Sequence, residues 1–384
     1  MWLLRDPWQL SKRQLIFPQA LAQMLPLCDG TRTPEMIQHE LSHQLGINMP
    51  FSVVDDALGE LDRAFLLHND RFESERERHL QAYRAQVYRP PALAGLGYPA
   101  EPSELTTLFQ GYANGTAPGE SDQWRGIVSP HIDYQRGGPV YGRVWRAAAP
   151  SVLEADLVLI FGTDHNGRSA SMTLTRQPYA TPYGVLPTDL DLIDQLAAAI
   201  GEEAAYREEL NHRNEHSVEL SAVWLHHVFH QAGQLPCPMI PILVGSFHHF
   251  VTSGTHPQDS PTYRRFLDAL CRATAGRRIL TIASVDLAHV GPAFGDTFDM
   301  DVQRRTRLRR EDEKLMEALT DGNAPEFYRQ IAQIDDRNRI CGFAPLYLML
   351  RYLESSAGVQ IAYAQCPADQ SDTSLVSICG LLLK

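Results

Sequence analysis

Residues 157–165 read Leu157-Val158-Leu159-Ile160-Phe161-Gly162-Thr163-Asp164-His165, an apolar run that ends in polar residues. A continuous apolar run of this length predicts a strand that is buried on both faces of a sheet. Residues 126–129 form a shorter apolar run, and His131 follows it closely. Because the carboxyl ends of parallel strands lie at one edge of an open α/β sheet, we expect these polar side chains to meet there.

The rest of the sequence beyond residue 125 alternates between apolar strand patterns and longer helical patterns. Strands are expected at residues 126–129, 157–162, 239–245, 279–284, 360–365 and 374–382. Helices are expected at residues 189–200, 215–231, 263–275, 299–319 and 345–354. Apolar strands joined by helices predict an α/β fold in which helices cover both faces of the sheet.

Composition and charge narrow the class of protein. The chain has 384 residues, 44% of them hydrophobic and 21% charged, as in an ordinary globular protein. A formal charge of -12 argues against sequence-independent binding to nucleic acid, which needs a basic face. We expect neither a signal peptide nor a membrane span. The six cysteines contain no Cys-x-x-Cys pair, so we expect no disulfide framework and a cytoplasmic location.

The chain is too long for one typical core, so either one large domain or two unequal domains are expected. Residues 1–75 predict a small helical or winged-helix domain, with helical patterns at 18–28, 33–43 and 53–66. Residues 76–87 continue as a polar helical linker. Residues 88–384 then form the large α/β domain.

Three histidines and an aspartate follow predicted strands. They are His131, His165 and, after the strand at 279–284, Asp286 and His289. On a helical turn, the spacing of three would place Asp286 and His289 on one face. Imidazoles and a carboxylate at one sheet edge suggest a metal site. Taken singly, each histidine could be a hydrogen-bonded structural residue, and Asp286 could be a helix cap.

Two further candidates lie at predicted helix starts. Glu215, His216 and Glu219 open one helix, where spacings of three and four would bring Glu219 beside the other two. Acidic residues are also favoured there by the helix dipole alone. Cys341 comes just before another helix, whose amino terminus would lower the pKa of the thiol and favour the metal-binding thiolate. The alternative for Cys341 is a buried packing residue.

Together these residues resemble the Memo family, found in bacteria as the B component of the AmmeMemoRadiSam system. The resemblance begins at residues 89–95 and 98–99 and continues to the carboxyl terminus. Its landmarks are Pro130-His131, Gly162 to His165, Tyr179-x-Thr181-Pro182-x-Gly184, Glu215-His216-Ser217-Val218-Glu219, Pro241-x-Leu243-Val244-Gly245, Asp286-x-x-His289-x-Gly291 and Ile340-Cys341-Gly342. The family implies an α/β sandwich with the fold of class III extradiol dioxygenases, and a radical SAM enzyme as a partner.

The resemblance also implies roles for the candidate residues. It gives His131, His165 and Cys341 as metal ligands, with the thiol replacing the carboxylate that holds iron in the dioxygenases. His289 corresponds to their acid/base histidine, and Asp286, which lies beside it, is expected to act with it by orienting His289 or binding substrate. Iron(II) is the expected metal, with copper or zinc as alternatives. We expect substrate-binding or supporting roles for four further residues: His216, Glu219, Asp133 and Asp164.

The chain departs from the family pattern at two landmarks. Where the family has His-Ala-Gly-Tyr, this sequence has His131-Ile132-Asp133-Tyr134. Where the family has Pro-Ser-His-His, it has Thr163-Asp164-His165-Asn166. Two additional aspartates near the metal would make the site harder and could change which metal it prefers.

Residues 1–75 are similar to a PqqD-type domain, with Leu27 to Thr33, Asp55-Asp56 and Leu66-Leu67 carrying the likeness. Such domains bind precursor peptides at a sheet edge; a winged-helix unit used for dimerisation or packing is the alternative. The two resemblances together imply a non-haem iron(II) redox enzyme, and the PqqD-type likeness suggests a peptide-borne substrate. The alternatives are a copper- or zinc-binding adaptor without turnover, or a zinc hydrolase. A homo-oligomer is plausible, and neither nucleic acid nor membrane is expected as a partner.

Overall fold

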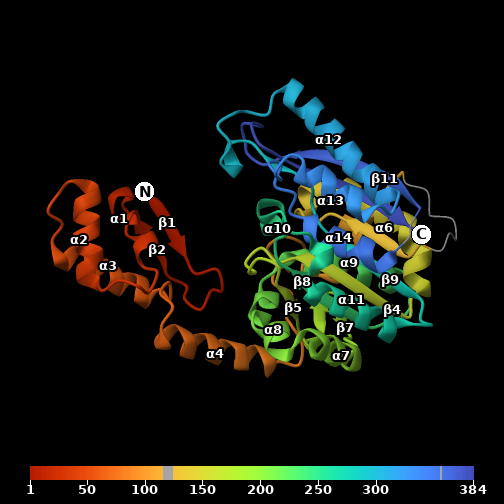
Figure 1. The fold of residues 1–384 in the computed structure, drawn as a ribbon. Helices are drawn as coiled ribbons and strands as arrows, with labels where there is room; N and C mark the ends of the chain where they lie inside the picture. Colours follow the sequence, from red (N-terminus) through yellow and green to blue (C-terminus); the bar gives the residue numbers. More distant parts are fainter. Residues whose placement is uncertain (116–123, 355–356) are drawn as a thin grey trace. The chain divides into compact units, whose positions relative to one another are not determined.

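The computed structural model describes residues 1–115, 124–354 and 357–384. The chain divides into two compact units, Met1–Ala85 and Gln86–Lys384 (Figure 1). The division falls at the end of helix α4, Asp70–Arg84, which spans the boundary expected at residue 75. Among the described residues, no helix is both long and apolar enough to cross a membrane.

The first unit contains a two-stranded antiparallel sheet and several helices. Its elements are β1 (Trp2–Arg5), β2 (Gln14–Phe17), α1 (Gln19–Ala22), α2 (Pro34–Leu45), α3 (Phe51–Arg63) and α4. Thr33 begins α2 by accepting a hydrogen bond from the backbone N–H of Met36, and Gly46 ends it in the left-handed conformation. The helix expected at 18–28 is replaced by α1 and a short 3-10 helix, Leu25–Leu27. The likeness to a PqqD-type domain stays a prediction.

The second unit is built on an eight-stranded mixed sheet with the order β10-β12-β3-β9-β4-β8-β5, in which β11 also pairs with β12. The strands are β3 (Gly126–Ser129), β4 (Leu157–Thr163), β5 (Met172–Leu174), β8 (Met239–Val244), β9 (Ile279–Ser284), β10 (His289–Val290), β11 (Gly358–Pro367) and β12 (Leu375–Leu383). A separate hairpin pairs β6 (Tyr179–Thr181) with β7 (Gly184–Leu186). Strands β3, β9, β4 and β8 are parallel, so their carboxyl ends share one edge.

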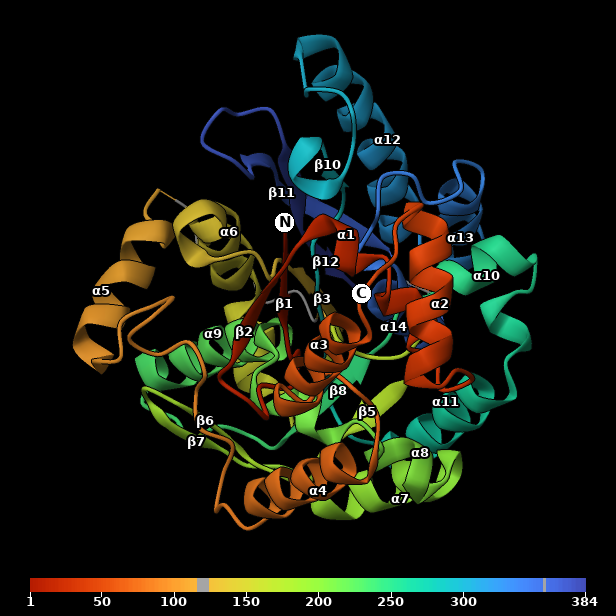
Figure 2. The same ribbon diagram turned by 90° about the vertical axis from the view of Figure 1, so that its left-hand side faces the viewer.

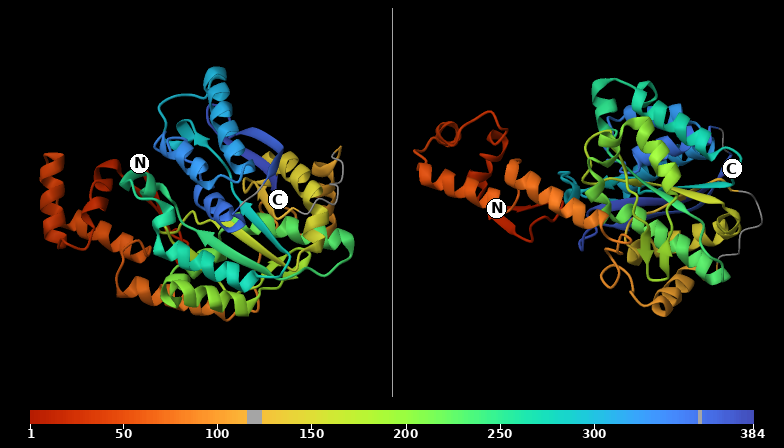
Figure 3. Two further views of the ribbon diagram at one scale, coloured as in Figure 1. Left: turned by 45° about the vertical axis from the view of Figure 1, so that its right-hand side comes forward. Right: turned by 90° about the horizontal axis from the view of Figure 1, so that it is seen from below.

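Helices cover both faces of this sheet. They are α5 (Pro102–Ala113), α6 (Tyr134–Glu154), α7 (Leu190–Ile200), α8 (Glu202–Tyr206), α9 (His216–Ala232), α10 (His248–Ser253), α11 (Pro261–Thr274), α12 (Val302–Thr320), α13 (Ala324–Ala332) and α14 (Phe343–Leu353). Figure 2 shows α5, α6 and α9 on one side of the sheet and α11, α13 and α14 on the other, and Figure 3 shows the same layers from two further directions. The α/β class is therefore confirmed.

Strand β4 shows how the sheet separates two cores. Leu157, Leu159 and Phe161 belong to one hydrophobic cluster, whereas Val158 and Ile160 belong to the other. This alternation follows from the period of two in a strand. Both faces are apolar because both carry helices, which explains the uninterrupted apolar run in the sequence.

Helix α6 was not predicted from the sequence. It spans Tyr134–Glu154 and contains Pro139 and Pro150, which mask a helical signature. Its glycines permit close packing on α5: a Cβ on Gly138 would lie 2.3 Å from the ring of Tyr112. The prolines and glycines that obscured this helix in the sequence are tolerated because the helix is held by its tertiary contacts.

The expected helical turn after β9 is wrong. Residues 285–288 form no helical turn, and the chain then enters the sheet as β10, which pairs with β12. Hydrogen bonds on both sides enforce this path: the N–H of Val285 donates to Ser129 O (2.8 Å), and that of Leu287 to Ser377 O (2.8 Å). Asp286 and His289 are consequently separated along a non-helical segment and do not share a helical face.

Candidate metal centre

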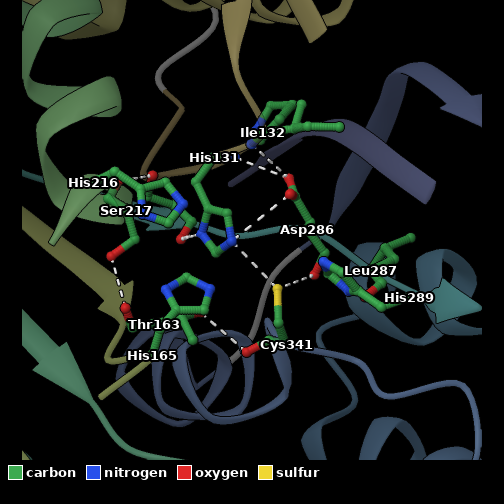
Figure 4. Close-up of polar contacts among 12 residues, drawn as sticks. His131, Ile132, Thr163, His165, His216, Ser217, Asp286, Leu287, His289 and Cys341 are labelled. Atoms are coloured by element: carbon green, nitrogen blue, oxygen red, sulfur yellow. Dashed lines mark hydrogen bonds and ion pairs between the residues drawn. The ribbon is translucent and has the colours of Figure 1, made fainter. Parts of the chain in front are cut away.

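Three side chains from separate elements meet at the carboxyl edge of the parallel strands (Figure 4). His131 follows β3, His165 follows β4, and Cys341 precedes α14. One donor atom from each lies within 4.8 Å of the other two. The thiol Sγ of Cys341 is 3.3 Å from Nε2 of His131. Such a group has the residue types and spacing that a metal ion requires.

His131 is held in one tautomer. Its Nδ1 lies 3.0 Å from the carbonyl oxygen of Ser284, which can only accept, so Nδ1 carries the proton and Nε2 presents a lone pair. The residue is only 2% exposed, and this burial lowers the pKa of the ring to about 3. His131 is therefore a neutral imidazole with its free nitrogen directed towards Cys341, as a metal ligand must be.

A carboxylate fixes the ring of His165 in a similar way. Its Nδ1 lies 3.1 Å from both carboxylate oxygens of Glu215. Burial lowers the pKa of His165, but the hydrogen bond and charge of Glu215 outweigh it and raise the pKa overall. Histidines that bind metals commonly donate their other ring N–H to a carboxylate in this way.

Glu215 was not assigned a role in the site by the sequence analysis, although it lies next to His216. It is the N-cap of α9 and accepts the backbone N–H of Ser217 (3.0 Å). Burial would raise its pKa, but the hydrogen bonds from His165 and His216 lower the pKa well below the ordinary value. A glutamate directly before a histidine at a helix start was the available clue.

Cys341 contradicts one sequence-based expectation. Burial raises the pKa of its thiol well above the ordinary value, instead of the helix amino terminus lowering it. The thiol donates towards the carbonyl oxygen of Asp286 (3.5 Å), and Gly342 separates Cys341 from the first residue of α14. The effect of the helix dipole is smaller than the loss of hydration, so the thiol keeps its proton until a cation replaces it.

Asp286 contacts His131, and no hydrogen bond or ion pair joins its side chain to His289. Its Oδ1 accepts the backbone N–H groups of His131 (2.9 Å) and Ile132 (3.1 Å). Its Oδ2 lies 3.7 Å from Nε2 of His131. The carboxylate therefore fixes the loop that carries His131 and adds negative charge beside the candidate ligands.

His289 lies at the start of β10, and its Nδ1 is 3.2 Å from the carbonyl oxygen of Leu287. The carbonyl can only accept, so Nδ1 carries the proton and Nε2 is the basic nitrogen. Burial lowers the pKa of His289, which keeps the ring neutral. This is the state in which an imidazole can accept a proton.

Three of the expected supporting residues have other partners. Glu219 accepts the backbone N–H groups of Ala92 and Leu93, both at 2.8 Å, and is fully buried. Asp164 accepts from Nδ2 of Asn211 (3.0 Å), and burial raises its pKa to about 7. Asp133 caps α6 and pairs with Arg136 (2.6 Å). The donor groups found among the described residues contain none of these three.

His216 does lie at the site. Its ring centroid is 4.8 Å from that of His165 and 5.3 Å from that of His131. Its Nδ1 lies 3.1 Å from Oε1 of Glu215. The structure thus places three imidazoles and one thiol together, with His216 outside the three-residue group that contains the thiol.

Fold and site together define an α/β protein with a candidate centre of imidazole and thiol donors. The model of the family described as Memo-like protein matches residues 89–382, and the chain belongs to this family. The resemblance found in the sequence is confirmed. The mixed sheet with helices on both faces agrees with the extradiol dioxygenase-like fold expected for it.

Individual relatives are similar over most of their length. A MEMO1 family protein of Aquifex aeolicus is 26% identical over 355 residues, which cover 92% of this chain and 87% of the relative. A MEMO1 family protein of Thermus thermophilus is 28% identical over 291 residues, which cover 76% of this chain and 81% of the relative. A MEMO1 family protein of Methanococcoides burtonii is 29% identical over 268 residues, which cover 68% of this chain and 86% of the relative. The Aquifex match is longer than the second unit and therefore extends into Met1–Ala85.

Proposed function

We propose that this chain is a non-haem iron(II) redox enzyme of the dioxygenase type, with His131, His165 and Cys341 as the metal ligands. The observation that carries the proposal is the mutual approach of their donor atoms to within 4.8 Å. The hydrogen bonds at Nδ1 of His131 and His165 leave Nε2 of each ring as the nitrogen available to a metal. Copper and zinc are the other metals that such donors accept.

The donor set fits a soft or borderline divalent ion. Two neutral imidazoles and one thiolate leave further coordination positions for oxygen and substrate. Cys341 would bind the ion as a thiolate, so metal affinity would depend on pH. Asp286, 3.7 Å from Nε2 of His131, partly compensates the positive charge of the ion.

Iron(II) at this place would supply the binding and one-electron chemistry of dioxygen, which is the oxidant in the proposed reaction. The protein residues would handle protons. Nε2 of His289 is the basic nitrogen of a neutral, partly buried ring and would remove a proton from the substrate. Glu215 and the carbonyl of Ser284 would hold the ligand rings in the required tautomers.

The substrate is proposed to be peptide-borne and the partner a radical SAM enzyme, in the cytoplasm. The PqqD-like interpretation of Met1–Ala85 supports a peptide, and the free state of all six cysteines supports a reducing compartment. A homo-oligomer is also proposed. Neither nucleic acid nor a membrane is proposed as a partner.

A metal-binding adaptor without turnover is the second candidate. It is favoured by the thiol of Cys341, because thiolate donors suit copper(I) and zinc better than carboxylates do. Zinc would also be the metal of a hydrolase that uses activated water. The identity of the bound metal separates these proposals from the first.

The test is elemental analysis of protein purified without oxygen, comparing wild type with Cys341→Ala. Cys379→Ala is the matched control, since Cys379 is another buried cysteine but lies in β12, outside the donor group. Stoichiometric iron in wild type and control, lost in Cys341→Ala, supports the redox enzyme. Copper or zinc supports the adaptor or the hydrolase, and full metal content in Cys341→Ala contradicts the ligand assignment.

A further inference from the structure

Glu215 contacts two imidazoles with one carboxylate. Both of its oxygens lie 3.1 Å from Nδ1 of His165, and Oε1 also lies 3.1 Å from Nδ1 of His216. The side chain is only 2% exposed. An ionised carboxylate can only accept hydrogen bonds, so Nδ1 is the nitrogen of His165 that carries a proton towards Glu215, and the 3.1 Å approach of His216 Nδ1 favours the same arrangement there. In the neutral form of each ring, the opposite nitrogen, Nε2, then has no proton.

Two backbone groups complete the environment of this carboxylate. Oε2 accepts the N–H of His165 (3.1 Å), and Oε1 accepts the N–H of Ser217 (3.0 Å). The carbonyl oxygen of Glu215 accepts a hydrogen bond from Nη2 of Arg89 (3.0 Å). The side chain and the backbone of Glu215 are thus both fixed, which restricts the rings of His165 and His216 that contact its carboxylate.

A second possible metal site lies beside the first. The donor atoms of His165, Glu215 and His216 also lie within 4.8 Å of one another, so they form a second group that could hold a metal. An ion bound there would have to displace the imidazole protons. The carboxylate has about four lone-pair positions. The imidazole of His165 and the backbone N–H groups of His165 and Ser217 donate to it, and Nδ1 of His216 lies 3.1 Å from Oε1. These contacts suit the carboxylate to orienting the two rings better than to binding an ion.

We propose that Glu215 is a positioning residue that fixes His165 and His216 in the Nδ1–H tautomer and so presents both Nε2 atoms at one metal centre. This inference rests on the proposed metal site. It separates the two groups of donor atoms: the group with Cys341 binds the ion, and the group with Glu215 orients the rings.

His216 gains a function from this arrangement. Its ring is stacked on that of His165, with an interplanar angle of 16° and a centroid distance of 4.8 Å. It is 39% exposed and stands beside the three proposed ligands without being one of them. Held in a single tautomer, it offers a free Nε2 that can accept a hydrogen bond or a proton from a molecule bound at the centre.

The test compares metal binding by Glu215→Gln and Glu209→Gln. Glu209 is the matched control, since it is a buried carboxylate that accepts the hydroxyl of Thr175 (2.9 Å) and belongs to neither group of donor atoms among the described residues. Zinc affinity is measured by competition with a chromophoric chelator, and the cobalt(II) form by its absorption spectrum. We expect Glu215→Gln to bind zinc roughly 10–100-fold more weakly and to change the cobalt spectrum. Glu209→Gln should keep the wild-type affinity and spectrum in its folded fraction.

A second measurement needs no variant. Long-range proton–nitrogen correlation spectra of histidine-labelled wild-type protein report which ring nitrogen carries the proton. We expect Nδ1–H on both His165 and His216, in the metal-free protein and in the zinc form. Loss of the Nδ1 proton of either ring on zinc binding would assign the ion to the group with Glu215 and overturn the proposal, as would wild-type zinc affinity in Glu215→Gln. Absence of metal binding by the wild type would instead refute the proposed function.

Discussion

Arg89 and Glu219 form an ion pair that is shielded from water, with 0% and 1% of their side chains exposed. The guanidinium also donates to the carbonyl oxygens of His212 (2.8 Å) and Glu215 (3.0 Å). The carboxylate in turn accepts the hydroxyl of Tyr98. This pair ties the start of the second unit to the amino terminus of α9, where the candidate metal centre lies.

Replacing Glu219 with Ala should strongly destabilise the second unit. The change leaves the Arg89 guanidinium buried without its partner, which typically costs about 3–5 kcal/mol in the free energy of unfolding. Urea denaturation of the metal-free protein measures this loss. Glu203→Ala, which removes a carboxylate that is 87% exposed, is the control and should change stability little. A loss below about 1 kcal/mol for Glu219→Ala would contradict the assigned structural role.

The position of Glu219 shows where helical spacing misled the sequence analysis. The spacing of four from Glu215 predicts two neighbouring side chains if both residues are helical. Glu215 is instead the N-cap, with a ψ of 128°, so its carboxylate turns back to Ser217 N–H. One carboxylate therefore contacts the histidines of the candidate metal centre, and the other binds the segment at residues 89–98.

Gly162 allows β4 and α9 to approach each other closely, and Gly162→Ala should disturb the metal centre from outside it. A Cβ at this position would lie 2.6 Å from Oγ of Ser217 and 2.7 Å from Cγ2 of Val218. Ser217 would have to give up its hydrogen bond to Thr163 O (2.8 Å). Overpacking of this kind typically costs about 1–3 kcal/mol, and displacement of the α9 start should also weaken zinc binding.

Thermal denaturation and zinc competition measure both effects of Gly162→Ala. Gly111→Ala is the control, because Gly111 lies in α5 with open space around its Cβ position. That change should leave zinc affinity unaltered and raise helix stability by about 0.5–1 kcal/mol. Equal stability of Gly162→Ala and wild type would show that α9 can shift without loss.

The buried carboxyl group of Asp312 should make the stability of the protein depend on pH. Burial raises the pKa of its carboxyl to about 7, although the hydroxyl of Tyr363 donates to it at 2.7 Å. The folded state thus holds this proton more tightly than the unfolded state, whose pKa is near 3.8. Stability from this group is full below the unfolded pKa, falls as the pH rises through the interval up to about 7, and is lost above it.

Asp312→Asn should therefore be more stable than wild type at pH 8, by on the order of 2–4 kcal/mol, because the amide carries no charge. The advantage should shrink as the pH is lowered towards 5. Urea denaturation across this range measures it. Asp369→Asn is the control: the hydroxyl of Ser374 and the N–H of Thr373 lower the pKa of half-buried Asp369 to about 2, so it titrates outside the range. A constant difference between wild type and Asp312→Asn would contradict the prediction.

The sequence was sufficient for the central strands of the sheet and for placing His131 and His165 at its carboxyl edge, whereas β5 and β10 were not predicted and Cys341 was given as a ligand only by the family resemblance. Continuous apolar runs mark strands covered on both faces, and His131 and His165 each lie two residues beyond the end of one of them. The supporting contacts were not predictable, since they join residues far apart in the chain. The carbonyl of Ser284 that fixes His131, and the backbone N–H groups that engage Asp286, become partners only when β3 and β9 pair.

The separate roles of Asp286 and His289 yield a final prediction. Asp286 lies 3.7 Å from Nε2 of His131 and accepts two backbone N–H groups, whereas Nδ1 of His289 contacts the carbonyl of Leu287. In Asp286→Asn an uncharged amide replaces the negative charge beside the ion, so zinc affinity should fall roughly 10–100-fold. His289→Ala should leave zinc affinity within about threefold of wild type, since its ring is outside the donor group.

Zinc competition and oxygen consumption distinguish these roles when measured on both variants. If His289 moves protons during turnover, His289→Ala retains the metal but consumes oxygen more slowly once a substrate is supplied. Equal loss of zinc by both variants would instead make His289 a ligand. Unchanged zinc affinity in Asp286→Asn would mean that its contacts with the N–H groups of His131 and Ile132, which an asparagine oxygen can also accept, are its whole contribution.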